Sequence, residues 1–185
     1  MMFLAGVCVA LLAVALWLRA TGFARKPATG TEVGAPEIDI RTHLSGPIIS
    51  EGVIYGPTGK VAGRFVADMV GTFDGAGGTL SEDFTFASGA KQRRKWALTF
   101  HNDGTFSATA DDIVGQARGW HQGASVCMRY RLRLEEDAGG HVIDVTDWLY
   151  LMENGTVMNR SEMRKFGFKV GELIATMRPV ANQHV

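Results

Sequence analysis

Short turn signals divide the chain into segments of strand length, and this division constrains the fold more than any other feature of the sequence. After residue 36, clusters rich in Gly, Asn, Asp and Pro recur at short intervals, at 56–59, 74–78, 88–89, 102–104, 137–140 and 154–155. The segments between them are rich in β-branched and aromatic residues and alternate apolar with polar side chains, which is the period of a β-strand. The sequence therefore predicts an all-β domain.

Nine or ten antiparallel strands joined by short hairpins form either a barrel or a sandwich. The strands follow one another as a meander, which favours an up-and-down barrel, an arrangement that also leaves no exposed sheet edge. Asp103-Gly104 and Asn154-Gly155 are hairpin markers, since both central residues of a type I′ turn need positive φ. No helical stripe longer than two turns is expected after the N-terminal segment.

The N-terminal residues Met1 to Leu18 carry no charged or strongly polar side chain. Eighteen helical residues span about 27 Å, close to the ~30 Å of bilayer hydrocarbon. No basic residue precedes the apolar run, which favours an uncleaved anchor over a cleaved signal peptide. We therefore predict a transmembrane helix within residues 1–24, a linker rich in Pro, Gly and Thr over 25–36 and a β-barrel domain over 37–185. Arg19, Arg25 and Lys26 follow the span, and the positive-inside rule then favours a cytoplasmic domain.

The overall composition excludes several classes of partner. Lys plus Arg and Asp plus Glu number 19 each, so the chain lacks the basic surplus of a nucleic-acid-binding protein. The alternating arginines of Arg129–Arg133 predict one solvated strand face. Cys8 and Cys127 fall in different predicted units and are not expected to pair. The five histidines share no metal-ligand spacing and no nucleotide-binding motif occurs, so we predict neither a metal nor a cofactor.

The predicted hairpin at 146–167 mixes charged and aromatic residues on both of its faces. With Asn154-Gly155 as a two-residue loop, Tyr150 faces Asn159, and Arg160 lies diagonal to Asp147 on one face. The other face then carries Trp148, Tyr150 and Asn159. Two interpretations remain open: an exposed ion pair on the strand face, or a polar cluster inside the barrel that orients the head group of a ligand.

A second hairpin, which turns at Ala87–Ala90, brings Glu82 close to Arg94 across the strand pair. Their shared face carries Leu80, Glu82, Phe84, Phe86, Gln92, Arg94, Trp96 and Leu98. If this face points inward, the two charges must be paired, because isolated burial is very costly. The neighbouring aspartates Asp111 and Asp112 point to opposite faces of a strand and supply too few ligands for a metal site.

The series LSEDF, RRKW, ADDIVGQARG and TDWLY…NGTVMNRSEMRKFGFKVG resembles the bacterial domain-of-unknown-function family 3833, over about residues 37–179. The matching positions are Glu82, Arg94, Trp96, Asp112, Gly115, Asp147, Trp148, Tyr150, Asn159, Arg160, Lys165 and Gly167. The resemblance implies a lipocalin-type barrel without an established activity, encoded near fatty-acid-modifying enzymes. Many members look like lipoproteins, which implies a periplasmic domain. This chain departs from the family in carrying an apparent transmembrane anchor instead of a lipobox, and Thr146 where a second Asp is expected.

These observations predict a single-pass protein of the bacterial inner membrane whose barrel binds a fatty-acyl or lipid ligand. Its predicted role is accessory to membrane lipid modification, with a membrane enzyme as a possible partner. The candidate ligand-binding residues are Glu82, Arg94, Trp96, Asp112, Asp147, Trp148, Tyr150, Asn159 and Arg160. One alternative is a non-catalytic scaffold for membrane enzymes. Another is a lipid-modifying enzyme, with Asp147 or Glu82 as general base and Arg160 or Arg94 as oxyanion partner; a catalytic role is the less favoured interpretation.

Overall fold

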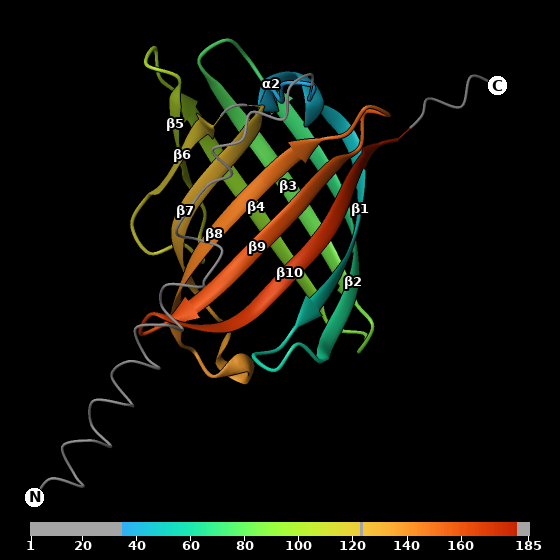
Figure 1. Cartoon of the computed structure of the whole chain (residues 1–185), viewed down its shortest axis with the longest axis vertical. Helices are drawn as coiled ribbons and strands as arrows, with labels where there is room; N and C mark the ends of the chain where they lie inside the picture. Colours follow the sequence, from blue (N-terminus) through green and yellow to red (C-terminus); the bar gives the residue numbers. More distant parts are fainter. Residues whose placement is uncertain (1–34, 123, 181–185) are drawn as a thin grey trace, which may run out of the picture.

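The computed structural model describes residues 35–122 and 124–180, and within them ten antiparallel strands close into one barrel (Figure 1). The strands are β1 Gly46–Tyr55, β2 Val61–Phe73, β3 Gly77–Phe86, β4 Lys91–Phe100, β5 Thr105–Thr109, β6 Ala117–Gln122, β7 Ser125–Arg133, β8 Val142–Leu151, β9 Val157–Lys165 and β10 Phe168–Pro179. Each strand pairs with its neighbours in sequence and β1 pairs with β10, which confirms the predicted up-and-down barrel. The predicted anchor over 1–24 lies outside the described residues. Within the described part of the chain, no helix is long and apolar enough to cross a membrane.

Strict alternation of side chains builds the interior. In β2, Phe65, Ala67 and Met69 are buried, whereas Val66 and Asp68 between them are exposed. The same period of two runs along β3, β4 and β7, so the apolar faces of the strands meet inside the barrel. Arg129 and Arg131 are exposed on the outer face of β7, as the sequence predicts, and Arg133 at the end of the strand is exposed and also lines the cavity.

Four hairpins share one three-residue loop, in which the third residue is a glycine with positive φ. These glycines are Gly59, Gly89, Gly104 and Gly155, with φ between 76° and 87°. At each of these loops, the residue that precedes the loop donates its backbone N–H to the carbonyl oxygen of the residue that follows the loop, at 2.8–2.9 Å. This is a type I turn followed by a left-handed residue. The hairpins marked by Asp103-Gly104 and Asn154-Gly155 are thus present, but the predicted type I′ turn is wrong there. Positive φ at both central residues occurs instead at Phe166-Gly167, with φ of 52° and 84°.

The three-residue loop changes the register of the β8–β9 hairpin by one residue from the prediction. Leu149 lies opposite Asn159, and Asp147 lies opposite Ser161. Because side chains alternate, a shift of one residue exchanges the two faces of one strand. The predicted diagonal pair of Asp147 and Arg160 is therefore wrong: Asn159 shares the inner face with Asp147, and Arg160 lies on the outer face.

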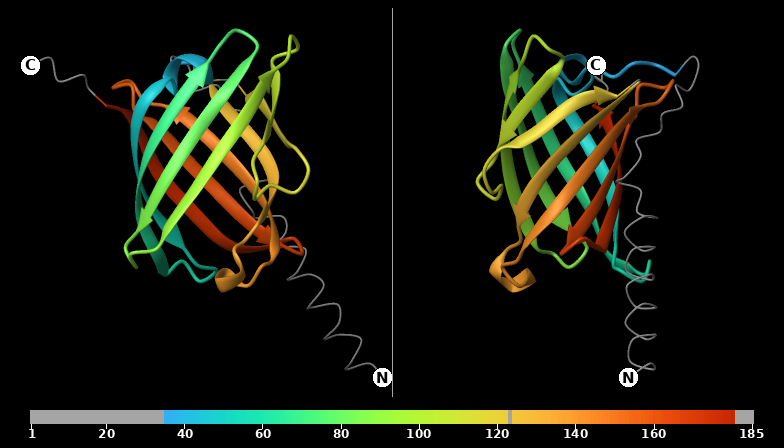
Figure 2. Two further views of the ribbon diagram at one scale, coloured as in Figure 1. Left: turned by 180° about the vertical axis from the view of Figure 1, so that it is seen from behind. Right: turned by 60° about the vertical axis from the view of Figure 1, so that its left-hand side comes forward.

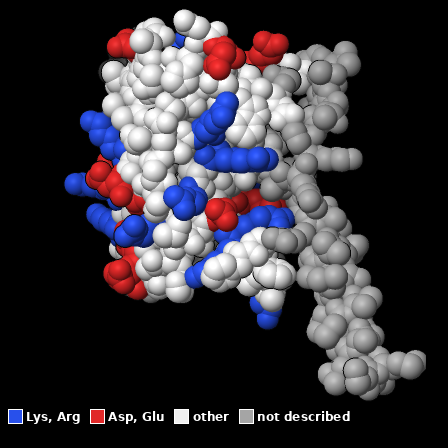
Figure 3. All heavy atoms as spheres, turned by 90° about the vertical axis from the view of Figure 1, so that its left-hand side faces the viewer, with Lys and Arg blue, Asp and Glu red and all other residues white. Residues whose placement is uncertain are grey.

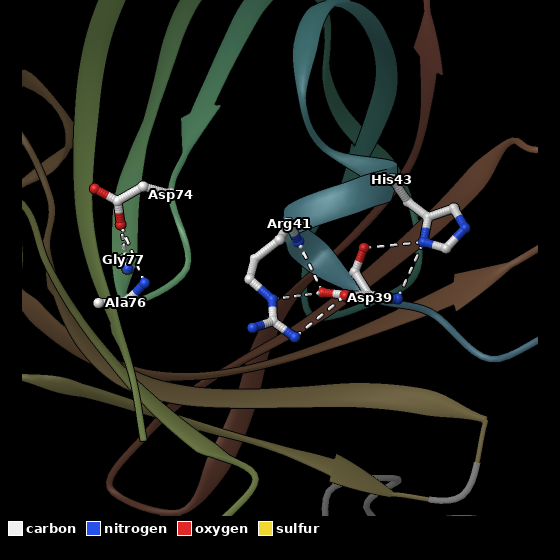
Figure 4. Close-up of polar contacts among 6 residues, drawn as sticks. All are labelled: Asp39, Arg41, His43, Asp74, Ala76 and Gly77. Carbon is white, nitrogen blue, oxygen red and sulfur yellow. Dashed lines mark hydrogen bonds and ion pairs between the residues drawn. The ribbon is translucent and has the colours of Figure 1, made fainter. Parts of the chain in front are cut away.

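The short helix α2, Ile40–His43, closes one end of the barrel (Figure 2). Asp39 caps it, because its Oδ1 accepts a hydrogen bond from the Arg41 backbone N–H at 3.0 Å and its carbonyl oxygen lies 2.9 Å from His43 Nδ1 (Figure 4). Ile40 and Leu44 of this segment are buried at the end of the interior. The same figure shows the β2–β3 turn, where Asp74 Oδ1 accepts from two backbone N–H groups.

A close backbone approach fixes the α2 segment on β2. At Gly71 a Cβ atom would lie 1.7 Å from the carbonyl oxygen of Leu44. Glycine is therefore required here by contact and not by its backbone angle. The approach lets the apolar side chains of the segment enter the mouth of the barrel.

We expect Gly71→Ala to lower the free energy of unfolding by about 1–3 kcal/mol, because the added methyl group must push Leu44 away from β2. Urea unfolding followed by tryptophan fluorescence measures the change. Gly63→Ala in the same strand is the matched control, since its Cβ would meet no atom closer than 4.0 Å. Equal destabilisation by the two substitutions would contradict the described packing of α2.

Candidate ligand-binding site

A cavity of about 460 Å³ occupies the interior of the barrel. Its walls are mainly apolar, and Ile40 and Leu44 close it at the α2 end. At the other end the lining includes Ala90 of the β3–β4 loop, Ala138 of the 3-10 helix η2 (Glu136–Ala138) and Glu135, which precedes this helix. Figure 2 shows that α2 and η2 lie at opposite ends of the barrel. The cavity therefore extends from α2 toward the loops at the η2 end, and its volume falls in the range of small-molecule sites.

One polar layer interrupts these apolar walls, and Arg94 is at its centre. Glu82 on β3 lies directly opposite Arg94 on β4, as predicted from the sequence. The Arg94 Nε donates to both carboxylate oxygens of Asp112, at 3.1 and 2.8 Å, and Nη2 donates to Oδ2 at 2.7 Å. Nη1 lies 3.6 Å from Glu82 Oε2. The guanidinium is thus held between two carboxylates, and the Trp96 ring lies 5.7 Å from it.

The connection between β5 and β6 delivers Asp112 to this layer. Ile113 forms an isolated bridge with Leu132 of β7, and the Arg133 N–H donates to the Asp112 carbonyl at 2.8 Å. The connection therefore pairs with β7. Asp111 is exposed while the Asp112 side chain turns inward to Arg94, which confirms that the two aspartates face different ways.

Asp147 and Tyr130 complete the layer from β8 and β7. The Tyr130 hydroxyl donates to Asp147 Oδ2 at 3.0 Å, and its ring packs edge-to-face on Trp96 with centroids 5.3 Å apart. Nearby, Ser161 Oγ donates to Asn159 Oδ1 at 3.3 Å, and Asn159 Nδ2 donates to the Trp148 carbonyl at 3.3 Å. These contacts fix the orientation of the polar groups on the inner face of the wall.

Burial shifts the proton equilibria of Glu82 and Asp147, the two carboxyl groups of the polar layer that line the cavity, toward neutral pH. Desolvation raises the pKa of Glu82 to about 7; the Arg94 charge lowers this pKa and the Asp147 charge raises it. Desolvation also raises the pKa of Asp147 to about 6, against the opposing effects of the Ser161 and Tyr130 hydroxyls. Burial raises the pKa of Tyr130 well above its usual value, so this hydroxyl stays protonated as a donor.

The structure divides the nine predicted site residues into three groups. Glu82, Arg94, Trp96, Asp147 and Asn159 line the cavity. Asp112 is absent from the lining but binds Arg94. The outer face of the β8–β9 hairpin carries the remaining three, Trp148, Tyr150 and Arg160, and Arg160 forms an ion pair with Glu172 there.

Sequence reasoning missed Tyr130 as a member of the polar layer. Its signal was present, because Tyr130 lies between two arginines assigned to the solvated face and must therefore point inward. Among the described residues, no group of three or more His, Cys, Asp or Glu side chains is arranged to hold a metal ion.

A closed antiparallel barrel with an interior cavity defines this protein as a lipocalin-like barrel. The chain belongs to the family described as "Protein of unknown function (DUF3833)", which matches residues 17–179 and confirms the resemblance. No curated protein matches the chain. Among solved structures, the S-type phycobiliprotein lyase CPES from Guillardia theta is similar with a TM-score of 0.57 and 9% identity, over 76% of this chain and 90% of that chain. At this identity the likeness concerns the fold alone.

The raised pKa of Glu82 predicts a stability that falls as pH rises. The folded state holds this proton more tightly than the unfolded chain, so the stabilisation present below about pH 4.5 is lost as pH increases through about 7. We expect the wild type to lose about 2–3 kcal/mol more than Glu82→Gln between pH 5 and pH 8, as measured by urea unfolding. Glu51→Gln on the exposed outer face is the control and should follow the wild type. Coincident pH profiles for all three proteins would contradict the buried position of Glu82.

Proposed function

We propose that this protein is a membrane-tethered barrel that binds a small apolar molecule, such as a fatty-acyl chain or another lipid, in its interior. The observation that carries this function is the cavity of about 460 Å³, with apolar walls and one polar layer. Transfer of apolar surface from water into such walls stabilises a complex by roughly 25 cal/mol per Å². The polar layer orients one end of the ligand. We further propose that the barrel serves a membrane enzyme that modifies lipids.

The cavity favours ligand binding over a purely scaffolding role. A scaffold needs only a packed core, and packed cores contain few voids larger than a water molecule. Ligand binding in the interior is also known for other small barrels of this fold, the lipocalins, which hold one small ligand.

A proton-transferring enzyme is the second candidate function. It is favoured by the two carboxyl groups, Glu82 and Asp147, whose pKa values near 7 and 6 suit general acid–base chemistry. Arg160 is not available as an oxyanion partner, because it lies on the outer face with Glu172. If the protein is such an enzyme, Asp147→Asn abolishes conversion of a bound lipid and leaves its binding intact.

The proposed membrane tether is residues 1–24, and the exposed β9–β10 hairpin supports a membrane nearby. Phe166 at its tip is 82% exposed and Phe168 is 48% exposed, flanked by Lys165 and Lys169. This tip lies at the same end of the barrel as η2 (Figure 1). Residues of the loops at that end line the cavity. Aromatic and basic side chains together suit the surface of a bilayer. Acidic and basic side chains are mixed on the face shown in Figure 3. Such a face lacks the basic surplus that suits a nucleic-acid partner, and we propose none.

We expect Leu173→Trp to weaken binding of 1-N-phenylnaphthylamine to the whole chain at least tenfold in a fluorescence titration. Leu173 lines the cavity, so the larger ring fills part of the volume that the probe needs. The next residue of β10 provides the control: Ile174 points outward and is 39% exposed, so Ile174→Trp should bind as the wild type does. Thermal melts establish that both variants are folded. Absence of probe binding by the wild type would refute the proposed function.

The tether predicts that the whole chain stays in the membrane pellet after alkaline carbonate extraction and enters solution only with detergent. Proteolysis of intact spheroplasts then determines the side: digestion of the barrel places it in the periplasm, as the family resemblance implies. Protection until lysis places it in the cytoplasm, as the flanking basic residues favour. Release by carbonate would contradict a membrane-spanning anchor.

A further inference from the structure

The charged and hydroxyl donors of the polar layer, Arg94 and Tyr130, are directed at acids of the same layer. Each of the three nitrogens of Arg94 faces a carboxylate, with Nε and Nη2 bonded to Asp112 and Nη1 at 3.6 Å from Glu82. The Tyr130 hydroxyl already donates to Asp147. A carboxylate or phosphate head group would compete with these buried acids for the guanidinium, and a buried carboxylate that loses its cation is costly.

Two acceptors in the same layer are, by contrast, unsatisfied. Glu82 Oε2 and Asp147 Oδ1 are fully buried and have no hydrogen-bond partner among the described residues. The residues themselves are only 7% and 9% exposed, and both line the cavity. A buried acceptor left unpaired costs about 1–3 kcal/mol, so a donor supplied by a ligand would recover that free energy at two positions.

The charge of the layer has the sign that such a donor needs. Its ionisable members are Arg94 with one positive charge and the carboxyl groups of Glu82, Asp112 and Asp147. When all three acids are ionised, the layer carries a net charge of 1 − 3 = −2. Glu82 and Asp147 both line one cavity, and Tyr130, which donates to Asp147, packs its ring on Trp96 beside Arg94 and Glu82. A cation placed between the two acids reduces the repulsion between their charges, and an anion increases it.

We propose, on the basis of the interior binding site proposed above, that the ligand is an apolar chain ending in a hydrogen-bond-donating head group, an ammonium or a hydroxyl, held by Glu82 Oε2 and Asp147 Oδ1. The apolar remainder of the ligand extends from the layer along the cavity wall. Arg94 then has a positioning role: it holds Glu82 and Asp112 in place and does not contact an anionic head group. This differs from the role of oxyanion partner that the enzyme alternative gave to Arg94.

The test compares three ligands of equal chain length that differ only in the head group: decylamine, decanol and decanoate. Each is added to the whole chain in amphipol, and native mass spectrometry counts the bound adducts. We expect decylamine and decanol to give at least fivefold more adduct than decanoate. In the Glu82→Gln/Asp147→Asn double variant, decylamine uptake should fall about tenfold relative to the wild type, and decanoate uptake should not fall.

The outcomes separate this inference from the proposed function. Uptake of all three ligands to the same extent, or preference for decanoate, would overturn the donor head group while leaving an apolar binding cavity. Uptake of none of them, together with failure of the naphthylamine probe, would overturn both. Because the comparison of head groups uses the wild type alone, it decides the question even if the double variant does not fold; circular dichroism establishes whether it does.

Discussion

The pairing of β1 with β10 is the interaction on which the rest of the structure depends. It joins eight consecutive residue pairs, from Ile48 with Pro179 to Tyr55 with Glu172, and closes a meander that would otherwise have two exposed edges. Closure also creates an inside. Without it, the inner face of β3 and β4 would meet water, Glu82 would keep an ordinary pKa, and no cavity would exist for a ligand. The end-capping α2 segment then has a well-defined role, because it seals one of the two openings that a closed barrel leaves.

The buried charges are a poor source of stability for such a barrel. Taking a guanidinium and its acids out of water costs several kcal/mol per ion, and apolar replacements of similar volume are often as stable. Removing only one partner is far more harmful, since it leaves a charge unpaired. The layer around Arg94 therefore has to be maintained as a unit of cation and acids. Its main consequence is chemical: it places polar atoms at a defined depth in an apolar cavity, where they contact one end of a ligand and leave the walls for the remainder.

The sequence predicted the β3–β4 face correctly and the β8–β9 face incorrectly, and both results follow from the turns. Each hairpin has a three-residue loop that ends in a left-handed glycine, Gly89 in one and Gly155 in the other. Placing the first turn across Ala87–Ala90 predicted that Glu82 lies close to Arg94, and the structure places them directly opposite each other. Assigning a two-residue loop to Asn154-Gly155 shifted the second hairpin by one residue, which is enough to exchange faces. A dipeptide signal establishes that a hairpin forms, but the loop length that sets its register depends on how the flanking residues bury, and this is decided by the closed barrel.

The roles inside the polar layer could not be predicted from the sequence, because they depend on a contact between distant segments. The sequence alone paired Arg94 with Glu82 on the neighbouring strand and named it as an oxyanion partner in the enzyme alternative. In the structure the nearer counter-charge of Arg94 is Asp112, eighteen residues away in the β5–β6 connection. Pairing of this connection with β7 is what brings the carboxylate to the guanidinium. Asp112 is hydrogen-bonded to Arg94 and Glu82 is ion-paired with it, and the two buried atoms of the layer that lack a hydrogen-bond partner among the described residues are both acceptors, Glu82 Oε2 and Asp147 Oδ1. The chemistry that the polar layer offers to a ligand is thus set by its surplus acids, and Arg94 serves to hold them in place.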